Sequence, residues 1–291
     1  MRAAAPSASE VRIRSGASHA GGVLRLLPLM LLCALILAAC ASAPPEPQNA
    51  RLAQAADYNR RGEAALKQGD YGRAQGFYRE ALRIDLSTEH SEGIAINSIN
   101  LARAHQLAGE RSLAHQTLDS LLGASALHLA PELVAAARLR KALLYQDEGK
   151  LADAGDWAER SEALCKDAGC AWRGTLLNLR ARLALARADA GAALVLAGQA
   201  LAVNRTRAAG EEIANSLRLQ AEARIHQQQF AAALAPLDEA LALDKRLGLP
   251  ERIEADLALM GEAHAGAGNA EQAREFRLRA ASVSKQRMPA E

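Results

Sequence analysis

Apolar residues along most of this chain follow a helical period. In the segment from Tyr58 to Asp85, apolar and small residues recur every three or four positions on both sides of a Gly69-Asp70 pair. That period is typical of amphipathic helices, and a glycine after a helix accepts the left-handed backbone conformation that ends it. The pattern therefore predicts two helices joined by a tight turn.

The same pattern recurs six times in phase. An alanine that opens the packing face of the second helix returns at spacings of 40, 40, 39, 40 and 40 residues. A small residue of the first helix returns in step with it, and glycine occupies the turn in four of the six copies. Small residues let two helices cross at close distance, so the recurrence favours a stack of helix hairpins over an ordinary helical bundle. The alanines are Ala74, Ala114, Ala154, Ala193, Ala233 and Ala273, the small residues are Gly62, Ala102, Ala142, Ala181, Ala221 and Gly261, and the turn glycines are Gly69, Gly109, Gly149 and Gly268.

Each unit resembles a tetratricopeptide repeat. The pattern of that family places a small residue eighth, a turn near the fifteenth position, then an alanine, an aromatic or large apolar residue four later and a small residue three after that; Gly62, Gly69, Ala74, Tyr78 and Ala81 follow it. The units here exceed the family's usual length of about 34 residues by about six. The resemblance implies an all-α solenoid, a superhelix of antiparallel helix hairpins, over residues 51–284, followed by a polar tail at 285–291.

Composition agrees with closely packed helices. Half of the 291 residues are apolar but only 3% are aromatic, and most of the apolar half is Ala and Leu. Few aromatic and β-branched residues argue against sheets, and alanine has the highest helix propensity. We therefore expect no sheet in this protein.

The N-terminal segment predicts a cleaved signal peptide over residues 1–39. The first 25 residues carry four arginines and one acid, and the 14-residue apolar stretch from Leu26 to Ala39 is shorter than the ~20 residues that a transmembrane helix needs. Residues 37 to 40, Leu-Ala-Ala-Cys, resemble the bacterial lipobox, which implies that Cys40 is lipidated and becomes the mature N-terminus. The alternative is an ordinary secretory signal with a chance cysteine.

The predicted lipid anchor gives an expected location. Position 41 is Ala and not the Asp that retains lipoproteins in the inner membrane, so the resemblance implies the periplasmic face of the bacterial outer membrane. Residues 40–50 form a tether with Pro44, Pro45 and Pro47, which disfavour a helix. We therefore expect the folded part to lie close to the membrane.

The formal charge of +2 comes from the signal segment. Removing residues 1–39 leaves 31 basic and 32 acidic residues, a net charge of −1. Nucleic-acid binding proteins need a basic footprint, so we expect no nucleic-acid partner.

Besides the predicted lipidation site Cys40, two cysteines remain in the predicted mature chain. Cys165 and Cys170 are separated by four residues, and in an oxidising periplasm they are candidates for a disulfide that closes a short loop. Two free thiols are the alternative. A redox-catalytic pair would have two intervening residues.

The sequence offers no candidate catalytic residues, metal ligands or cofactor motif. None of the mature histidines lies three or four positions from another, and no carboxylate cluster completes a metal set. His105 and His264 occupy a repeat position that usually holds a packing residue of aromatic size, as Tyr145 does in the third copy. We expect a protein that is not an enzyme, has no cofactor and takes no small-molecule substrate.

A groove is the remaining candidate for function. In tetratricopeptide solenoids the first helices line the concave side, and arginine recurs there in four consecutive middle copies. The planar guanidinium binds carboxylates through two hydrogen bonds, which suits an acidic peptide or a terminal carboxylate. Alternatively, the arginine stems cover neighbouring leucines while their heads stay in water. The candidate groove residues are Asn59, Arg60, Asn100, Arg103, Arg140, Asn178, Arg182, Arg218 and Glu222.

The resemblance implies a scaffold or adaptor that binds an envelope protein or peptide. Of the five positions that form the carboxylate clamp in chaperone-binding members of the family, only Asn100 and Arg140 match, so that specific function is not supported. A pilotin-like role, or a role in assembling an outer-membrane secretion or barrel complex, is the alternative.

Overall fold

The structure is a computed structural model that describes residues 50–165 and 170–287. The predicted signal peptide (1–39), the lipidation site Cys40 and the rest of the tether up to residue 49 lie outside the described residues. Within the described ranges the secondary structure is twelve α-helices and one short 3₁₀ turn, with no strand. The expected absence of sheet is therefore met in this part of the chain.

The twelve helices form six hairpins in chain order. Each hairpin has a first helix, a turn of a few residues and a second helix, as the repeats predict, and the last helix continues three residues beyond Ser284. The hairpins are α2 (Ala50–Lys67) with α3 (Tyr71–Ser87), α4 (Ser91–Leu107) with α5 (Arg111–Gly123), α6 (Pro131–Asp147) with α7 (Leu151–Glu162), α8 (Arg173–Ala186) with α9 (Ala190–Thr206), α10 (Gly210–His226) with α11 (Phe230–Leu247), and α12 (Pro250–Gly266) with α13 (Ala270–Arg287); the 3₁₀ turn η1 spans Ser125–Leu127.

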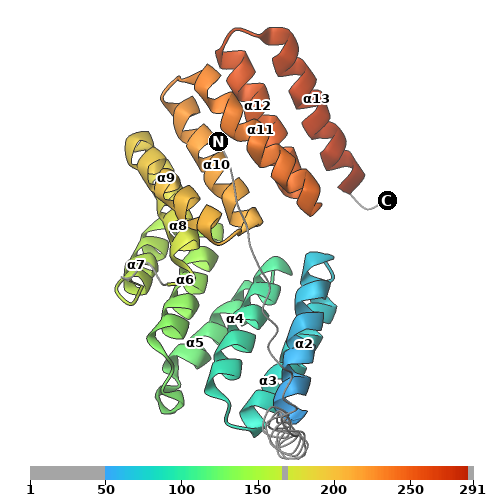
Figure 1. The fold of residues 1–291 in the computed structure, drawn as a ribbon, viewed down its shortest axis with the longest axis vertical. Helices are drawn as coiled ribbons and strands as arrows, with labels where there is room; N and C mark the ends of the chain where they lie inside the picture. The colour runs from blue at the N-terminus through green and yellow to red at the C-terminus, as the bar shows by residue number, and fades with distance from the viewer. Residues whose placement is uncertain (1–49, 166–169, 288–291) are drawn as a thin grey trace, which may run out of the picture. The chain divides into compact units, whose positions relative to one another are not determined.

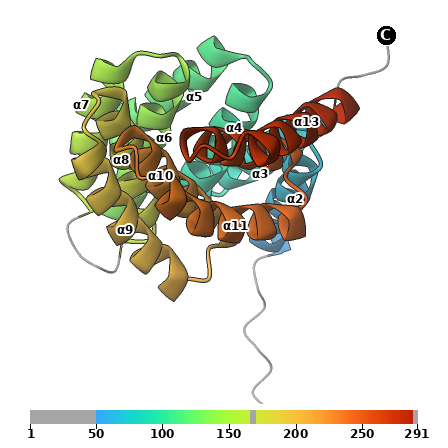
Figure 2. The same cartoon turned by 90° about the horizontal axis from the view of Figure 1, so that it is seen from above.

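Within residues 51–287 the hairpins stack one after another (Figure 1). Each second helix packs on the first helix of the next hairpin, and first helices of successive hairpins also touch, as α8 and α10 do. Seen from above, the stack curls (Figure 2). The first helices α4, α6, α8 and α10 lie on the inner side of the stack.

The repeat positions are the crossing points of the helices. Every alanine of the second-helix series is at most 2% exposed, and every small residue of the first-helix series is buried. A Cβ added to Gly62 would lie 2.7 Å from the Tyr78 ring. The side chains at these positions are small because neighbouring helices occupy the space.

The turn inside each hairpin requires a left-handed residue. Gly69, Gly109, Gly149 and Gly268 have φ between +74° and +82°. The two copies without glycine adopt the same conformation, with φ of +59° at both Ala188 and Gln228. The turn geometry is thus shared by all six hairpins, although only four of them have the residue that adopts it without strain.

Successive hairpins meet at a recurring junction of three positions: one on the first helix of a hairpin, one near or just beyond the end of its second helix, and one on the first helix of the next hairpin. We call these the junction positions. In the first interface they hold Asn59, Asp85 and Asn97: Asn97 Nδ2 donates to Asp85 Oδ2 (2.7 Å), and Asn59 Nδ2 donates to Asn97 Oδ1 (2.5 Å). Asp85 and Asn97 are at most 3% exposed. Their polar atoms are therefore paired inside the protein, as buried polar groups require.

Two further junctions are polar with different chemistry. Asn178, Asn204 and Ser216 occupy the fourth, where Ser216 Oγ accepts from Asn204 Nδ2 (3.1 Å) and donates to Asn178 Oδ1 (2.8 Å). The fifth junction holds an arginine and two aspartates. Each polar junction thus uses a different set of residues, and at the fifth one oxygen of each aspartate, Asp244 Oδ1 and Asp256 Oδ2, has no hydrogen-bond partner among the described residues.

The second and third junctions are mainly apolar. Ile99 and Ala137 lie together in one hydrophobic cluster, and Leu139 and Leu176 lie together in another. Cys165 takes the remaining position of the third junction, packs on Ala135, and is joined in a disulfide to Cys170 with the two Cα atoms 5.4 Å apart. The predicted cysteine pair thus lies beside a junction between hairpins.

Candidate binding groove

The inner side of the stack contains a cavity of about 620 Å³. Its lining comes mostly from the first helices α4, α6, α8 and α10. A second cavity, of about 850 Å³, shares Arg103, Leu107, Glu211 and Arg252 with the first and brings α2 and the start of α12 into the same lining. We call the two together the inner groove.

Arginines from three consecutive hairpins line the 620 Å³ cavity. Arg103 lies on α4, Arg140 on α6 and Arg182 on α8. Arg182 donates from Nη2 to Asn215 Oδ1 on α10 (3.0 Å). No ion pair joins any of these three arginines to a carboxylate among residues 50–165 and 170–287. The groove therefore holds cations whose charge is not neutralised by a direct partner.

Arg140 has the least favourable surroundings of the three. Its Nε is buried without a hydrogen-bond partner among the described residues. Burial, and after it the positive charge of Arg103, lowers the pKa of Arg140 to about 10, against the opposing effect of Glu212 and Asp147. The guanidinium is still protonated near neutral pH. A charge held in this way is a strong attractor for an anion.

The carboxylates in the same wall already have other partners. Glu212 Oε2 accepts from Asn178 Nδ2 (2.7 Å), and Asp147 accepts from Gln106. Glu211 pairs with Arg252 at 3.3 Å. The described residues that line the 620 Å³ cavity include five arginines and three carboxylates, so the cavity is net positive.

Exposed apolar side chains border these charges. Leu107 is 44% exposed, Trp172 38% and Leu247 44%, and all three line the 620 Å³ cavity. Large apolar groups that face solvent inside a concave surface are typical of binding sites for a ligand that is itself partly apolar. The groove thus combines cations with apolar contact area.

Four of the predicted groove residues line the inner groove. They are Arg103, Arg140, Asn178 and Arg182, and of these Asn178 is only 1% exposed. The other predicted residues lie outside both cavities. Asn59 belongs to the first junction, Arg60 pairs with Asp57 on the surface of α2 (2.7 Å), and Asn100, Arg218 and Glu222 line neither cavity.

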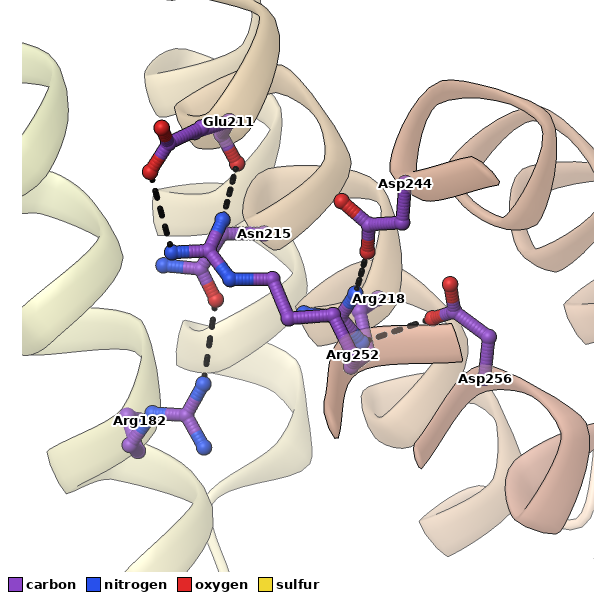
Figure 3. A network of polar contacts seen from close by, with 7 residues as sticks. All are labelled: Arg182, Glu211, Asn215, Arg218, Asp244, Arg252 and Asp256. Carbon is purple, nitrogen blue, oxygen red and sulfur yellow. Dashed lines mark hydrogen bonds and ion pairs between the residues drawn. The ribbon is translucent and has the colours of Figure 1, made fainter. Parts of the chain in front are cut away.

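The assignment of Arg218 to the groove is corrected by its place at the fifth junction. Figure 3 shows Arg218 of α10 reaching Asp244 of α11 and Asp256 of α12, beside the separate contacts of Arg182 with Asn215 and of Arg252 with Glu211. Arg218 Nε donates to Asp256 Oδ1 (2.7 Å), and its Nη2 donates to Asp244 Oδ2. The arginine is 6% exposed, so it cannot bind a partner from solvent.

Several lining residues from outside the first helices were not predicted from the sequence. Trp172 directly precedes α8, Leu247 ends α11, and Arg207 lies between α9 and α10. Arg252 belongs to the first turn of α12. A large apolar residue next to a connection between hairpins is the one sequence signal that would have marked Trp172 and Leu247.

The candidate histidines are packing residues, as predicted. His105 is 7% exposed and its Nδ1 lies 2.5 Å from Glu110 Oε2. The His264 ring stacks on Phe276 with centroids 5.2 Å apart. Over the described ranges, no group of three His, Cys, Asp or Glu side chains is placed to hold a metal ion. None of the helices described has the length and apolar character needed to cross a bilayer.

Comparison with known proteins identifies the fold. No family model matches the sequence, and no curated protein matches it. Solved structures do match. A Rap protein complexed with competence and sporulation factor matches with a TM-score of 0.62 and 14% identity; the match covers 81% of this chain and 66% of the Rap chain, just under two thirds of its length. BtubC from P. vanneervenii matches with a TM-score of 0.54 and 17% identity over 84% of this chain and 95% of BtubC. PilF of Pseudomonas aeruginosa also matches, with a TM-score of 0.53 and 15% identity over 79% of this chain and 92% of PilF. The predicted all-α, tetratricopeptide-like solenoid is confirmed.

Proposed function

We propose that this chain is a protein-binding scaffold that holds a segment of a partner protein in the inner groove. The observation that carries the proposal is that two kinds of side chain line the same cavity. Arg103 and Arg140 lack a carboxylate partner in the described residues, and Leu107, Trp172 and Leu247 expose apolar surface beside them. A concave surface of this chemistry on a stack of rigid hairpins suits an extended peptide segment. The proposed role is binding and not catalysis.

Site-specific photocrosslinking tests the scaffold role. A photoreactive phenylalanine analogue at Leu107 lies in the groove, and the same analogue at Leu278 lies on α13, where the native side chain is 62% exposed but lines neither cavity. We expect the Leu107 probe, in the full chain in its native cells, to crosslink one discrete partner that the Leu278 probe does not capture. Identical crosslinking patterns at the two sites would contradict the proposal.

The second part of the proposal is the location. The sequence from Leu26 to Cys40 supports a lipid anchor on Cys40 and a place on the periplasmic face of the outer membrane. We expect Cys40→Ala to abolish metabolic labelling with a palmitate analogue and to release the chain from the membrane fraction. A labelled, membrane-bound variant would rule out this anchor.

A narrower form of the proposal is an assembly factor for an outer-membrane complex, with a pilotin-like role as one case. The fold that the chain shares with PilF supports the architecture but not a particular client. Deletion of the gene followed by analysis of secretin multimers tests this form. Multimers of normal abundance would exclude it and would leave the general scaffold role intact.

A further inference from the structure

We infer that the inner groove recognises a carboxylate carried by an extended, partly apolar peptide, and that Arg103 and Arg140 together bind that carboxylate. The inference rests on the proposed scaffold function and names the chemistry of the partner segment. It comes from three observations: two adjacent cations without an ion-pair partner among the described residues, anions of the wall that are engaged elsewhere, and apolar contact area beside the cations.

The first observation is the charge imbalance between α4 and α6. Arg103 and Arg140 come from successive first helices and line the same cavity. They are close enough for the charge of Arg103 to disfavour protonation of Arg140, and Arg140 Nε lacks a partner among the described residues. A carboxylate between the two guanidinium groups would satisfy Nε–H and remove the repulsion.

The fifth junction shows how the same chain holds a buried arginine when no ligand is needed. Arg218 is enclosed by two carboxylates, Asp244 and Asp256, each of which accepts one of its hydrogen bonds. Arg140 lies next to Leu139, which holds the corresponding junction position of an earlier hairpin, and it has no carboxylate within ion-pair distance in the described residues. In the part of the chain that the structure describes, Arg140 of the groove thus lacks the carboxylates that enclose Arg218.

The carboxylates of the cavity wall are engaged by other partners. Glu212 and Asp147 are the acids whose charges act on Arg140. Both are already hydrogen-bonded, Glu212 to Asn178 and Asp147 to Gln106. Neither makes an ion pair with Arg140 or Arg103. These two acids therefore accept hydrogen bonds from neighbouring amides, and the two arginines are available to an external anion.

The third observation selects a peptide over a free inorganic anion. Leu107, Trp172 and Leu247 expose apolar surface in the same cavity. Phosphate or sulfate would leave this surface in water. A segment with a carboxylate and neighbouring apolar side chains would cover it and would gain from both contacts.

The carboxylate has two sources in a peptide, the chain end and an Asp or Glu side chain. Four N-acetylated hexapeptides based on Ser-Ala-Leu-Ala-Glu-Leu separate them. The first has both the glutamate and a free C-terminus, the second replaces glutamate with glutamine, the third has an amidated C-terminus, and the fourth has both changes. Inorganic phosphate serves as the probe for an anion without apolar groups.

Tryptophan fluorescence gives a direct reading of the groove. The sequence has two tryptophans, Trp157 and Trp172, and only Trp172 lines the cavity. In the full chain carrying Trp157→Phe, we expect the first peptide to change Trp172 emission in a saturable way. The neutral fourth peptide should bind at least about 10-fold more weakly, since it lacks a charge-assisted hydrogen bond.

Charge variants test the two arginines. Arg103→Gln and Arg140→Gln should each weaken binding of the charged peptide by about 10-fold or more, whereas Arg274→Gln, a matched change at an exposed site on α13, should not. Circular dichroism checks that each variant is folded. If Arg140→Gln is unfolded, Arg140→Lys retains the charge without the guanidinium fork and should bind with intermediate affinity.

The outcomes separate the two proposals. Equal binding of the charged and neutral peptides, unchanged affinity in the arginine variants, or an equal response to inorganic phosphate would each overturn the carboxylate inference. If the Leu107 probe still captures a discrete partner in that case, the scaffold function stands without it. If the charged peptide binds through both arginines and no partner is captured, the scaffold function fails and the carboxylate site remains.

Discussion

At the scale of single residues, the turns at Ala188 and Gln228 carry strain that the other four hairpins avoid. Both have φ of +59°, in the left-handed region where an L-residue with a Cβ is disfavoured. Glycine occupies the same place at Gly69, Gly109 and Gly149. Nothing in the exposed surroundings of Ala188 or Gln228 requires the larger side chain.

We expect Ala188→Gly and Gln228→Gly each to raise the free energy of unfolding by about 0.5–1 kcal/mol, because relief of the left-handed strain exceeds the entropic cost of glycine. Gly109→Ala, the reverse change in a hairpin of the same geometry, should lower it by about 1 kcal/mol. Urea denaturation followed by circular dichroism measures all three. Stabilisation by Gly109→Ala would contradict this account of the turns.

The two aspartates around Arg218 share one buried cation, so one carboxyl group tends to keep its proton. Burial, and after it the charge of Asp244, raises the pKa of Asp256 from 3.8 to about 6, although Arg218 acts in the opposite direction. The pKa of Asp244 is raised as well, also by burial. The folded state therefore binds the proton of Asp256 more tightly than the unfolded state does, and this binding adds to the free energy of unfolding. The contribution is complete below about pH 3.8 and is lost as the pH rises through about 6.

We therefore expect Asp256→Asn to be more stable than the unmodified chain at pH 7.5, by about 3 kcal/mol or less, and equal to it near pH 4. The amide oxygen still accepts from Arg218 Nε, and the asparagine side chain does not become charged as the pH rises. Urea denaturation at the two pH values measures the difference. Asp238→Asn on the exposed face of α11 is the control and should change the free energy of unfolding by the same amount at both pH values.

At the scale of the helix hairpin, the crossing points explain the alanine series. Ala154 is fully buried where α7 packs, and it lies in one hydrophobic cluster with Ala142 of α6. Its neighbour Ala152 is exposed. The sequence period alone separates these two alanines of one helix into a packing position and a surface position.

Ala154→Leu should lower the free energy of unfolding by about 1–3 kcal/mol, because the larger side chain overpacks the crossing. Ala152→Leu adds the same atoms on the exposed face of α7 and should change stability by about 0.5 kcal/mol or less. Thermal or urea denaturation of the two variants provides the comparison. Equal effects would mean that the two helices do not cross at Ala154.

Helix hairpins could be predicted from the sequence because each copy needs a small residue at the same repeat position, where two helices cross. Ala74 and Gly62 identify a crossing only weakly, but six aligned copies identify it clearly. The groove could be predicted only in part. Arg182 and Arg218 both lie on first helices, yet one faces the cavity and the other a junction, because their partners, Asn215 and the two aspartates, lie 26 to 38 residues away in the chain.

At the scale of the whole molecule, each hairpin depends mainly on its immediate neighbours, as in other solenoids. Among the described residues, the last hairpin, α12 with α13, packs mainly on α10 and α11, and Arg218 with Asp256 is a buried contact that holds it there. Damage at this contact should therefore remain local instead of unfolding every hairpin.

We expect Arg218→Met to cost about 3–5 kcal/mol at the fifth junction, because it leaves Asp244 and Asp256 buried without their cation. Hydrogen exchange with mass spectrometry should show lost protection over residues 250–287 and retained protection over residues 91–147. Arg246→Met, at an exposed arginine of α11, serves as the control. Uniform loss of protection along the chain would contradict nearest-neighbour coupling.

The junction positions also bear on how the protein changes over evolutionary time. Each polar junction is a set of three side chains spaced 12, 26 and 38 residues apart in the chain, and each set has its own chemistry. A substitution at one member leaves a buried polar group unsatisfied unless the other members change with it. Paired substitutions in relatives of this protein should therefore recur at those spacings, and hairpins transplanted between positions should fail unless their junction residues are transplanted with them.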